Sequence, residues 1–264
     1  MEWWLGYLAL GAVVGFFAGL LGIGGGAIIV PLLVMLFTAQ GLPKMHLLHL
    51  AVGTSMASIL FTSASSVRAH AVRGVLRWDI AAKMTPGILG GGLAGAYLTR
   101  YFSTFGFAVF FAAFVYVAAG NMLIDRRPKA RRDLPGMIGM SVVGAAIGGF
   151  SALAAIGGAV MTVPFLLYCN VPLLQAIGTA AMIGFPIALA GSVGFMLTGY
   201  GAAGLPPYSA GYVYLPALVG LSVASILFAP VGAALAHRMP TAQLKRVFAV
   251  LLLVLATRML IALS

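Results

Sequence analysis

The chain contains Leu21-Gly22-Ile23-Gly24-Gly25-Gly26-Ala27-Ile28-Ile29-Val30-Pro31, and a close copy, Ala155-Ile156-Gly157-Gly158-Ala159-Val160-Met161-Thr162-Val163-Pro164, follows about 130 residues later. Each copy interrupts an apolar segment with glycines and proline. In lipid, such a break exposes backbone N–H and C=O groups, so it is stable only where protein or a wet cavity surrounds it. A break that recurs in both halves of a membrane protein indicates a transport site.

Composition indicates the class of protein. Hydrophobic residues make up 62% of the 264 residues, charged residues only 7%, and 35 residues are glycine. These values predict a polytopic, multi-pass membrane protein with the lipid bilayer around it. The longest charged stretch, residues 125–133, is too short for a soluble domain. The single cysteine, Cys169, excludes an internal disulfide and a cysteine-based metal cluster, and we expect neither a metal nor a cofactor.

The spans follow from length and hydropathy, since a transmembrane helix needs about 20 apolar residues. Two apolar pieces, 27–38 and 159–169, follow the glycine clusters and are too short to cross alone. Glycines 90, 91, 92 and 95 are expected to allow close helix packing. Full spans are predicted at 5–22, 46–66, 80–99, 103–124, 135–156, 174–198, 211–236 and 243–263.

The net charge of +11 gives the orientation of these spans. Loops 67–79 and 125–133 are basic and read as cytoplasmic, whereas loop 199–210 is uncharged and reads as external. Nucleic acid is therefore not an expected partner, although contacts with anionic lipid heads stay open. When the chain is followed from these loops across each predicted span, residues 135–169 begin and end on the cytoplasmic side. Residues 5–38 begin and end on the external side. Each broken segment is thus predicted to be a re-entrant helical hairpin.

The two halves also align beyond the breaks, which indicates an internal duplication. Residues 52–55, Val-Gly-Thr-Ser, match residues 177–180, Ile-Gly-Thr-Ala. The predicted fold is all-α, with two repeats of inverted topology, each a broken hairpin plus three transmembrane helices. The repeats are residues 1–124 and 135–264, joined by a basic cytoplasmic linker at 125–134.

The breaks predict a site for an anion. A helix that begins inside the membrane presents unbonded N–H groups and the positive end of its dipole, and glycine lets a ligand approach the backbone. The competing interpretation is that the glycines only allow close packing. The predicted substrate-binding residues are Gly24, Gly25, Gly26 and Pro31 in the first copy, and Gly157, Gly158, Ala159 and Pro164 in the second.

Hydroxyl groups extend this predicted site. Thr54 and Thr179 occupy equivalent places in the two halves, and Ser55 lies beside Thr54. We assign these three to the substrate site, and Ser58, Ser151 and Thr162 as further candidates. The alternative is that these hydroxyls bond to helix carbonyls, as Ser and Thr in membrane helices often do.

The acidic residues are also informative, because Glu2, Asp79, Asp125 and Asp133 all lie in loops or at span ends. A proton-coupled cation carrier usually keeps a carboxylate within the bilayer, so the predicted substrate is a small anion. His46 and His49 share one helix face and leave a proton relay or a metal pair open as alternatives.

At residues 22–33 and 51–55 the chain resembles the TauE/SafE family of membrane permeases, also called sulfite exporters, and the likeness covers nearly the whole chain. The resemblance implies a carrier in the inner membrane of a prokaryotic cell for small sulfur-containing anions such as sulfite or organosulfonates, with no ATPase and no cofactor. Two departures, Ala159 in place of Gly26 and Ala180 in place of Ser55, imply that the half-sites differ.

The predicted function is a secondary transporter, an exporter of such oxyanions by alternating access, and not an enzyme. A passive anion channel and a carrier of another small organic anion are alternatives, and a homodimer stays open. A more remote alternative is an intramembrane hydrolase with Ser151 as nucleophile and His237 as base, although a short Gly-x-Ser pattern is a weak signal.

Overall fold

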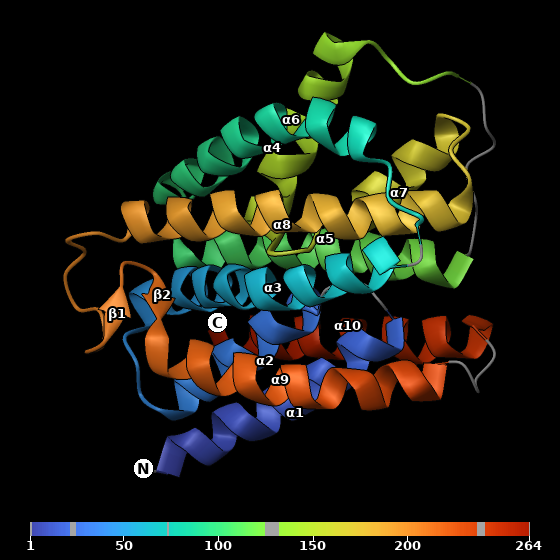
Figure 1. Ribbon diagram of the computed structural model, residues 1–264. Coiled ribbons are helices and arrows are strands. Elements are labelled where there is room, and N and C mark those ends of the chain that lie inside the picture. The colour runs from blue at the N-terminus through green and yellow to red at the C-terminus, as the bar shows by residue number, and fades with distance from the viewer. Residues whose placement is uncertain (1, 22–24, 73, 125–131, 237–240, 264) are drawn as a thin grey trace.

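The structure, a computed structural model, describes residues 2–21, 25–72, 74–124, 132–236 and 241–263 (Figure 1). These residues form ten α-helices, in two runs of five. The first run is α1 (Glu2–Leu21), α2 (Gly26–Ala39), α3 (Leu47–Val72), α4 (Trp78–Leu98) and α5 (Thr104–Ile124). The second run is α6 (Met137–Ala154), α7 (Ala159–Tyr168), α8 (Leu173–Thr198), α9 (Leu215–Ala236) and α10 (Thr241–Leu263).

Short elements connect some of these helices. Two 3₁₀-helices, η1 (Lys44–His46) and η2 (Thr99–Tyr101), precede α3 and α5. The strands β1 (Ser209–Ala210) and β2 (Val213–Tyr214) form an antiparallel hairpin before α9. The predicted span 211–236 was therefore wrong at its start. Gly211 adopts a φ of 57°, a left-handed conformation that ends regular helix and lets the chain turn.

The helices agree with a multi-pass membrane protein. Five segments are long and apolar enough to cross a bilayer, namely residues 44–72, 104–124, 137–154, 173–198 and 246–263. Helices α2 and α7 count among the shorter apolar helices, as expected for pieces that do not cross alone. Each of the other predicted spans coincides with a helix, and α3 continues to Val72, beyond its predicted end.

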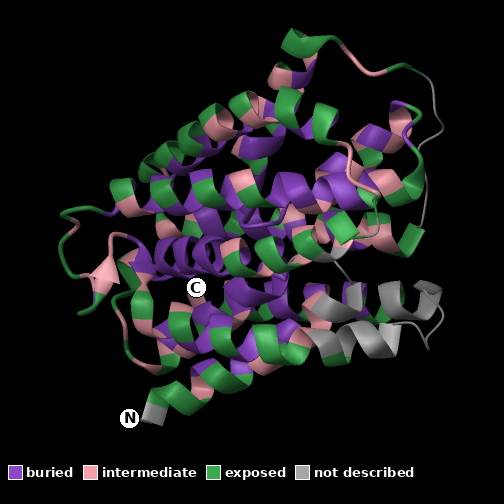
Figure 2. Cartoon of the chain, in the orientation of Figure 1, coloured by how far each residue is buried: buried purple, intermediate pink, exposed green. Residues whose placement is uncertain are grey.

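Helices α3 and α8 form the centre of the molecule. They lie side by side and run in opposite directions (Figure 1). Their most apolar stretches are 78% and 61% buried, against 33% for α10, and Figure 2 shows both as largely buried. The exposed apolar faces of the outer helices suit contact with lipid.

Two outer helix pairs pack through small residues. Helix α1 packs on α9 and α4 packs on α6, and these are the most extensive contacts between helices. A Cβ at Gly15 would collide with the backbone of Ser225, and one at Gly91 with the carbonyl of Ala145. Such close backbone approach is usual for membrane helices. The packing prediction is confirmed for glycines 91, 92 and 95, whereas Gly90 has no atom near its would-be Cβ.

The β1–β2 hairpin lies at one end of this bundle (Figure 1). It contacts α3 and α8, close to where α3 begins and α8 ends. The opposite ends of α3 and α8 lie at the other end of the molecule (Figure 1). The short helices α2 and α7 lie against α3 and α8, respectively, between these two ends.

Candidate functional site

The two glycine-rich breaks form the centre of the candidate site. Helix α2 begins at Gly26 and helix α7 begins at Ala159, so both start at the glycine clusters. Pro31 and Pro164 lie inside these helices, each as the sixth residue. Proline has no N–H, so each helix lacks one hydrogen bond in its second turn. Gly24 is outside the described residues.

The breaks turn the chain in different ways. In the first break, Gly25 has a φ of 70°, and its carbonyl accepts the N–H groups of Ile28 and Ile29 at 3.0 Å. In the second break, the left-handed residue is Ala155, with a φ of 48°, at the end of α6. Gly158, which directly precedes α7, has an ordinary φ of −46°. The backbone conformation beside the short helix therefore favours glycine in the first break but not in the second.

The two breaks meet in space. A Cβ added to Gly26 would collide with the carbonyl oxygen of Ala155 and would lie 2.9 Å from Cδ1 of Ile59 on α3. The start of α2 is therefore in contact with the second break. A Cβ on Gly158 would lie 2.5 Å from Cδ1 of Ile187 on α8 and 3.3 Å from the Thr162 hydroxyl. Gly26 and Ala155, 129 positions apart in sequence, thus share one region.

Most of the predicted backbone residues are inside the protein. Ala159 is half-buried and Pro164 is exposed. The buried members are Gly25, Gly26, Pro31, Gly157 and Gly158.

Three of the predicted hydroxyls are buried without a hydrogen-bond partner. Ser55 and Ser58 on α3 are 0% and 1% exposed, and Thr162 on α7 is 0% exposed. Their oxygen atoms form no hydrogen bond among the described residues. Buried polar groups in proteins nearly always have a partner, and each exception needs an explanation such as an absent ligand.

Thr54 and Thr179 have partners, and the two bonds are equivalent. The Thr54 hydroxyl accepts the backbone N–H of Tyr214 at 2.9 Å, directly before α9. The Thr179 hydroxyl accepts the backbone N–H of Arg77 at 3.1 Å, directly before α4. Each threonine of a central helix therefore holds the start of a helix from the other half. Both are fully buried, and their assignment to substrate stays a prediction.

Ser151 lies buried on α6, just before the second break. Its carbonyl accepts the N–H of Ile156 at 3.2 Å, which closes the end of α6. His237 lies outside the described residues, so a pairing between these two side chains stays untested.

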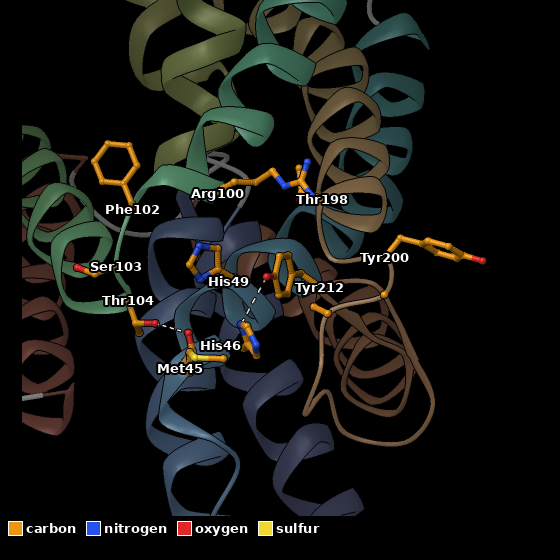
Figure 3. A pocket seen from close by; sticks show the side chains of 12 residues that line it. Met45, His46, His49, Arg100, Phe102, Ser103, Thr104, Thr198, Tyr200 and Tyr212 are labelled. Atoms are coloured by element: carbon orange, nitrogen blue, oxygen red, sulfur yellow. Dashed lines mark hydrogen bonds between the residues drawn. The ribbon is translucent and has the colours of Figure 1, made fainter.

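A second group of polar residues lines a cavity of about 460 Å³ near the β1–β2 hairpin (Figure 3). His46, His49, Arg100 and Tyr212 are its principal polar members. The sequence prediction found the two histidines through their spacing, but not Arg100 or Tyr212 as members of a site. Only three-dimensional structure brings these residues together, since the histidines lie at η1 and the start of α3, Arg100 in η2, and Tyr212 between β1 and β2.

The electrostatics of the interior suit an anion. None of the buried polar side chains in the described part of the chain is Asp or Glu. Asp79 is half exposed and pairs with Arg77 at 2.7 Å, and this guanidinium holds the pKa of Asp79 below its ordinary value. No cluster of three or more metal-binding side chains occurs within the ranges that the structure describes.

Sequence comparison gives a family. The family described as "Sulfite exporter TauE/SafE" matches residues 7–259. A "Probable membrane transporter protein" of Haemophilus influenzae is 34% identical over 253 residues, which cover 96% of each chain.

More distant relatives carry similar names. The "Probable membrane transporter protein YunE" of Bacillus subtilis is 27% identical, over 73% of this chain and 78% of its own length. A "Probable membrane transporter protein" of Methanocaldococcus jannaschii is 26% identical, over 85% of this chain and 80% of its own length. No solved structure matches.

Proposed function

The chain belongs to the TauE/SafE sulfite exporter family, and on this premise we propose that it is a secondary transporter of small sulfur-containing oxyanions. The substrate would bind between the two breaks, where α2 and α7 begin. The first-turn N–H groups of these helices would supply partial positive charge. Sulfite and organosulfonates fit this description, and export across a prokaryotic inner membrane is the direction that we propose.

The observation that carries the proposal is the set of unpartnered hydroxyls. Ser55, Ser58 and Thr162 each hold a donor away from water. An oxyanion has several acceptor oxygens, so it can satisfy such donors together with backbone N–H groups. Ser58 is next to Ile59, which contacts Gly26, and Thr162 lies beside Gly158. The donors are therefore associated with both breaks.

The charge of the substrate follows from the surroundings of these donors. A cation at this depth usually requires a carboxylate within the membrane. The described buried residues include none, whereas two helix N-termini are present. An anion is therefore the better match.

The reciprocal contacts support two inverted repeats, residues 1–124 and 135–264, joined by the linker 125–134. Under this division α1 corresponds to α6, and α4 to α9, so the α1–α9 and α4–α6 pairs are equivalent. The Thr54–Tyr214 and Thr179–Arg77 bonds are likewise equivalent. The antiparallel arrangement of α3 and α8 is what an inverted repeat requires. The broken segments α1–α2 and α6–α7 would then be the re-entrant hairpins.

This symmetry suits alternating access, in which one repeat rocks against the other around a fixed site. An anion with one negative charge gains about 2.3 kcal/mol for every 100 mV when it leaves an inside-negative cell. The membrane potential alone can therefore drive export, and the chain has no Gly-x-x-x-x-Gly-Lys motif for ATP.

The test is anion flux in proteoliposomes that contain the full chain. Sulfite, sulfate, an organosulfonate and a carboxylate are compared, with and without a membrane potential and a pH gradient. We expect saturable flux of sulfite or the sulfonate that responds to potential. Flux that rises linearly with concentration would indicate a channel. If no anion moves and none raises the melting temperature, the proposal fails.

A further inference from the structure

Eight of the helices pack in two groups that differ from the two halves of the sequence. Helix α1 makes its most extensive contact with α9, and α4 makes its most extensive contacts with α6 and α8. Helix α2 packs on α3, and α7 packs on α8. Figure 1 shows α4, α6 and α8 in the upper part of the molecule and α1, α2 and α9 in the lower part. We call α1, α2, α3 and α9 the first unit, and α6, α7, α8 and α4 the second unit. Each unit takes its fourth helix from the other half of the chain.

The exchanged helices α9 and α4 pack backbone on backbone within their units. A Cβ on Gly11 of α1 would lie 2.7 Å from the carbonyl oxygen of Leu221 on α9, and the glycines of α4 approach the backbone of α6 as closely. The Ser141 hydroxyl of α6 also donates to the Lys83 carbonyl of α4 at 2.9 Å. Close-packed backbones resist compression, so each exchanged helix is expected to move with its new unit.

The reciprocal threonine bonds fasten the same two helices. Thr54 on α3 holds the segment that begins α9, and Thr179 on α8 holds the segment that begins α4. The glycine before each threonine admits that segment. A Cβ on Gly53 would lie 2.3 Å from the carbonyl oxygen of Tyr212, and one on Gly178 would lie 2.9 Å from a side-chain carbon of the segment before α4. Both bonds therefore join parts of one unit.

The buried apolar residues form two separate cores that follow the units. One core consists of residues of α4, α6, α7 and α8, such as Met84 and Ile187, and two residues of α3, Met56 and Ile59, reach into it. The other core contains residues of α1, α2, α3 and α9, continues into α5 and α10, and reaches the second break. Burial of apolar surface thus stabilises each unit around a core of its own.

The contact between the units is made mainly by α3 and α8, through side chains. A Cβ on Gly191 of α8 would lie 3.1 Å from Cγ and Sδ of Met56 on α3, and one on Gly184 would lie 3.8 Å from Cβ of Ser63. Methionine is unbranched and flexible, so it can adjust when one helix shifts past another. The exception is the backbone contact between the two breaks, described above. The two units can therefore shift around the candidate site.

The chain passes directly from one unit to the other at two places, between α3 and α4 and between α8 and α9. Gly74 lies in the first connection with a φ of 66°, and Gly201 lies in the second with a φ of 75°. Neither has another atom within 4 Å of its would-be Cβ. Such loop residues can absorb a change of backbone angle without displacing neighbours, which is what a hinge requires.

We propose that the bodies that move against each other during transport are these two exchanged units, and that α4 and α9 each move with the opposite repeat. The proposal rests on the transport function proposed above and refines its rocking motion. The remaining helices, α5 and α10, pack on each other and are joined by a hydrogen bond of 2.8 Å between the Tyr116 and Thr257 hydroxyls. Movement of the units changes the distance from α4 to α1, which is in the same half, and keeps the distance from α4 to α6.

The test is a pair of distance measurements by pulsed electron paramagnetic resonance on the full chain in lipid, in a Cys169→Ala background. Both proteins carry one spin label at Trp78→Cys on α4. The second label is at Phe150→Cys on α6 or at Val13→Cys on α1, and all three side chains are exposed. Phe150 follows a residue that contacts Gly91 of α4, so it lies about 20 Å from Trp78 along the helix, at roughly 1.5 Å per residue.

We expect the distance between Trp78 and Phe150 to be narrowly distributed and unchanged when sulfite is added. The distance between Trp78 and Val13 should be distributed more broadly, with or without sulfite, by several ångströms. If the sequence repeats were the moving bodies, the two results would be exchanged, and this outcome overturns the inference. Equally broad or equally narrow distributions overturn it as well, because the units would then not differ.

Tethers give a functional measurement of the same motion. Ser63→Cys with Gly184→Cys places two Cβ atoms 3.8 Å apart across the contact between the units, the usual separation in a disulfide. Oxidation should abolish anion flux in proteoliposomes, and a reductant should restore it. The matched control joins Lys83→Cys on α4 to Ser141→Cys on α6 with a short thiol-reactive linker, and its flux should stay nearly unchanged. Loss of flux in the control, or full flux in the oxidised disulfide, contradicts the proposal.

Failure of the transport proposal looks different from failure of this inference. If the chain is not a transporter, no anion crosses proteoliposomes that contain the unmodified protein, yet the distance between Trp78 and Val13 is still distributed more broadly than that between Trp78 and Phe150. If only the inference fails, anions cross, and the spread of distances between Trp78 and Phe150 equals or exceeds the other.

Discussion

The two breaks differ at the residue that begins each short helix. In the first break this residue is Gly26, which packs against the backbone of the second break, and in the second break it is Ala159. Gly26 begins α2 in contact with the Ala155 carbonyl, and Gly25 before it has a left-handed φ of 70°. Ala159 begins α7, is half-buried, and follows Gly158 in ordinary helical conformation. The same motif therefore has two structural roles. The first copy places Gly26 in close contact with a backbone carbonyl, and the second copy supplies that carbonyl through Ala155.

The hydroxyls show a complementary difference. Thr162 of α7 corresponds to Ile29 of α2, because each lies two residues before the proline. On the central helices, Ser58 corresponds to Ile183, since each lies four residues after the matched threonine, Thr54 or Thr179. Each half thus supplies a hydroxyl where the other is apolar. Two copies of one motif have become unequal halves of one proposed site.

The largest effect is expected from exchanging the residues that begin the short helices. Gly26→Ala places a methyl group on a backbone carbonyl that cannot move aside, so we expect a loss of about 3 kcal/mol or failure to fold. Ala159→Gly should cost about 1 kcal/mol or less. Thermal unfolding and the yield of monodisperse protein measure both. Equal tolerance of the two changes would show that the breaks are equivalent after all.

Removing the unpartnered hydroxyls should separate function from stability. Thr162→Val and Ser58→Ala remove buried donors that nothing in the fold uses, so stability should stay the same or rise by about 1 kcal/mol. Oxyanion flux should fall about tenfold in each, because a hydrogen bond to the substrate is lost. Flux in proteoliposomes and the melting temperature are measured on the same preparations. Lower stability with normal flux would assign these hydroxyls to the fold.

The reciprocal threonines should behave alike. Thr54→Val leaves the N–H of Tyr214 unbonded, and Thr179→Val does the same for Arg77, so each should lose about 1 kcal/mol of stability. Denaturation in mild detergent compares the two variants directly. A large loss of stability at one position only would mean that the two threonine hydrogen bonds differ in strength, as the two breaks differ in structure.

The smallest effect concerns the ion pair between Arg77 and Asp79, next to the hydrogen bond from Arg77 to Thr179. Arg77 lowers the pKa of Asp79, just outside the predicted span 80–99. A depressed carboxylate stabilises the fold above its unfolded pKa, and the contribution disappears as pH falls through the folded value. Since the Asp79 side chain is 49% exposed, Asp79→Asn should cost about 0.5 kcal/mol or less at neutral pH. Melting temperatures of both proteins should converge in acid; a constant difference would contradict this origin.

The spans could be predicted from sequence because each depends on a local property, the length of an apolar run. The breaks could be predicted because the same glycine cluster recurs in both halves, although the helices begin at the glycines and continue through Pro31 and Pro164. The β1–β2 hairpin could not, since Val213 and Tyr214 continue the apolar composition of α9. The contact of Gly26 with Ala155 and the cavity around His49 depend on distant segments meeting, and a sequence pattern in one segment carries no information about that. The spacing of His46 and His49 was the only local signal.

The packing of α1 on α9 has a consequence for biogenesis. Gly15 of α1 fits against Ser225, so α1 meets its principal neighbour only after about 200 further residues have been made. Until then its small-residue face lacks a protein partner, and early membrane insertion must precede tertiary assembly. Nascent chains that end before α9 would present α1 unpaired, a state that invites misassembly or degradation. Tertiary assembly of α1 therefore waits for the synthesis of α9.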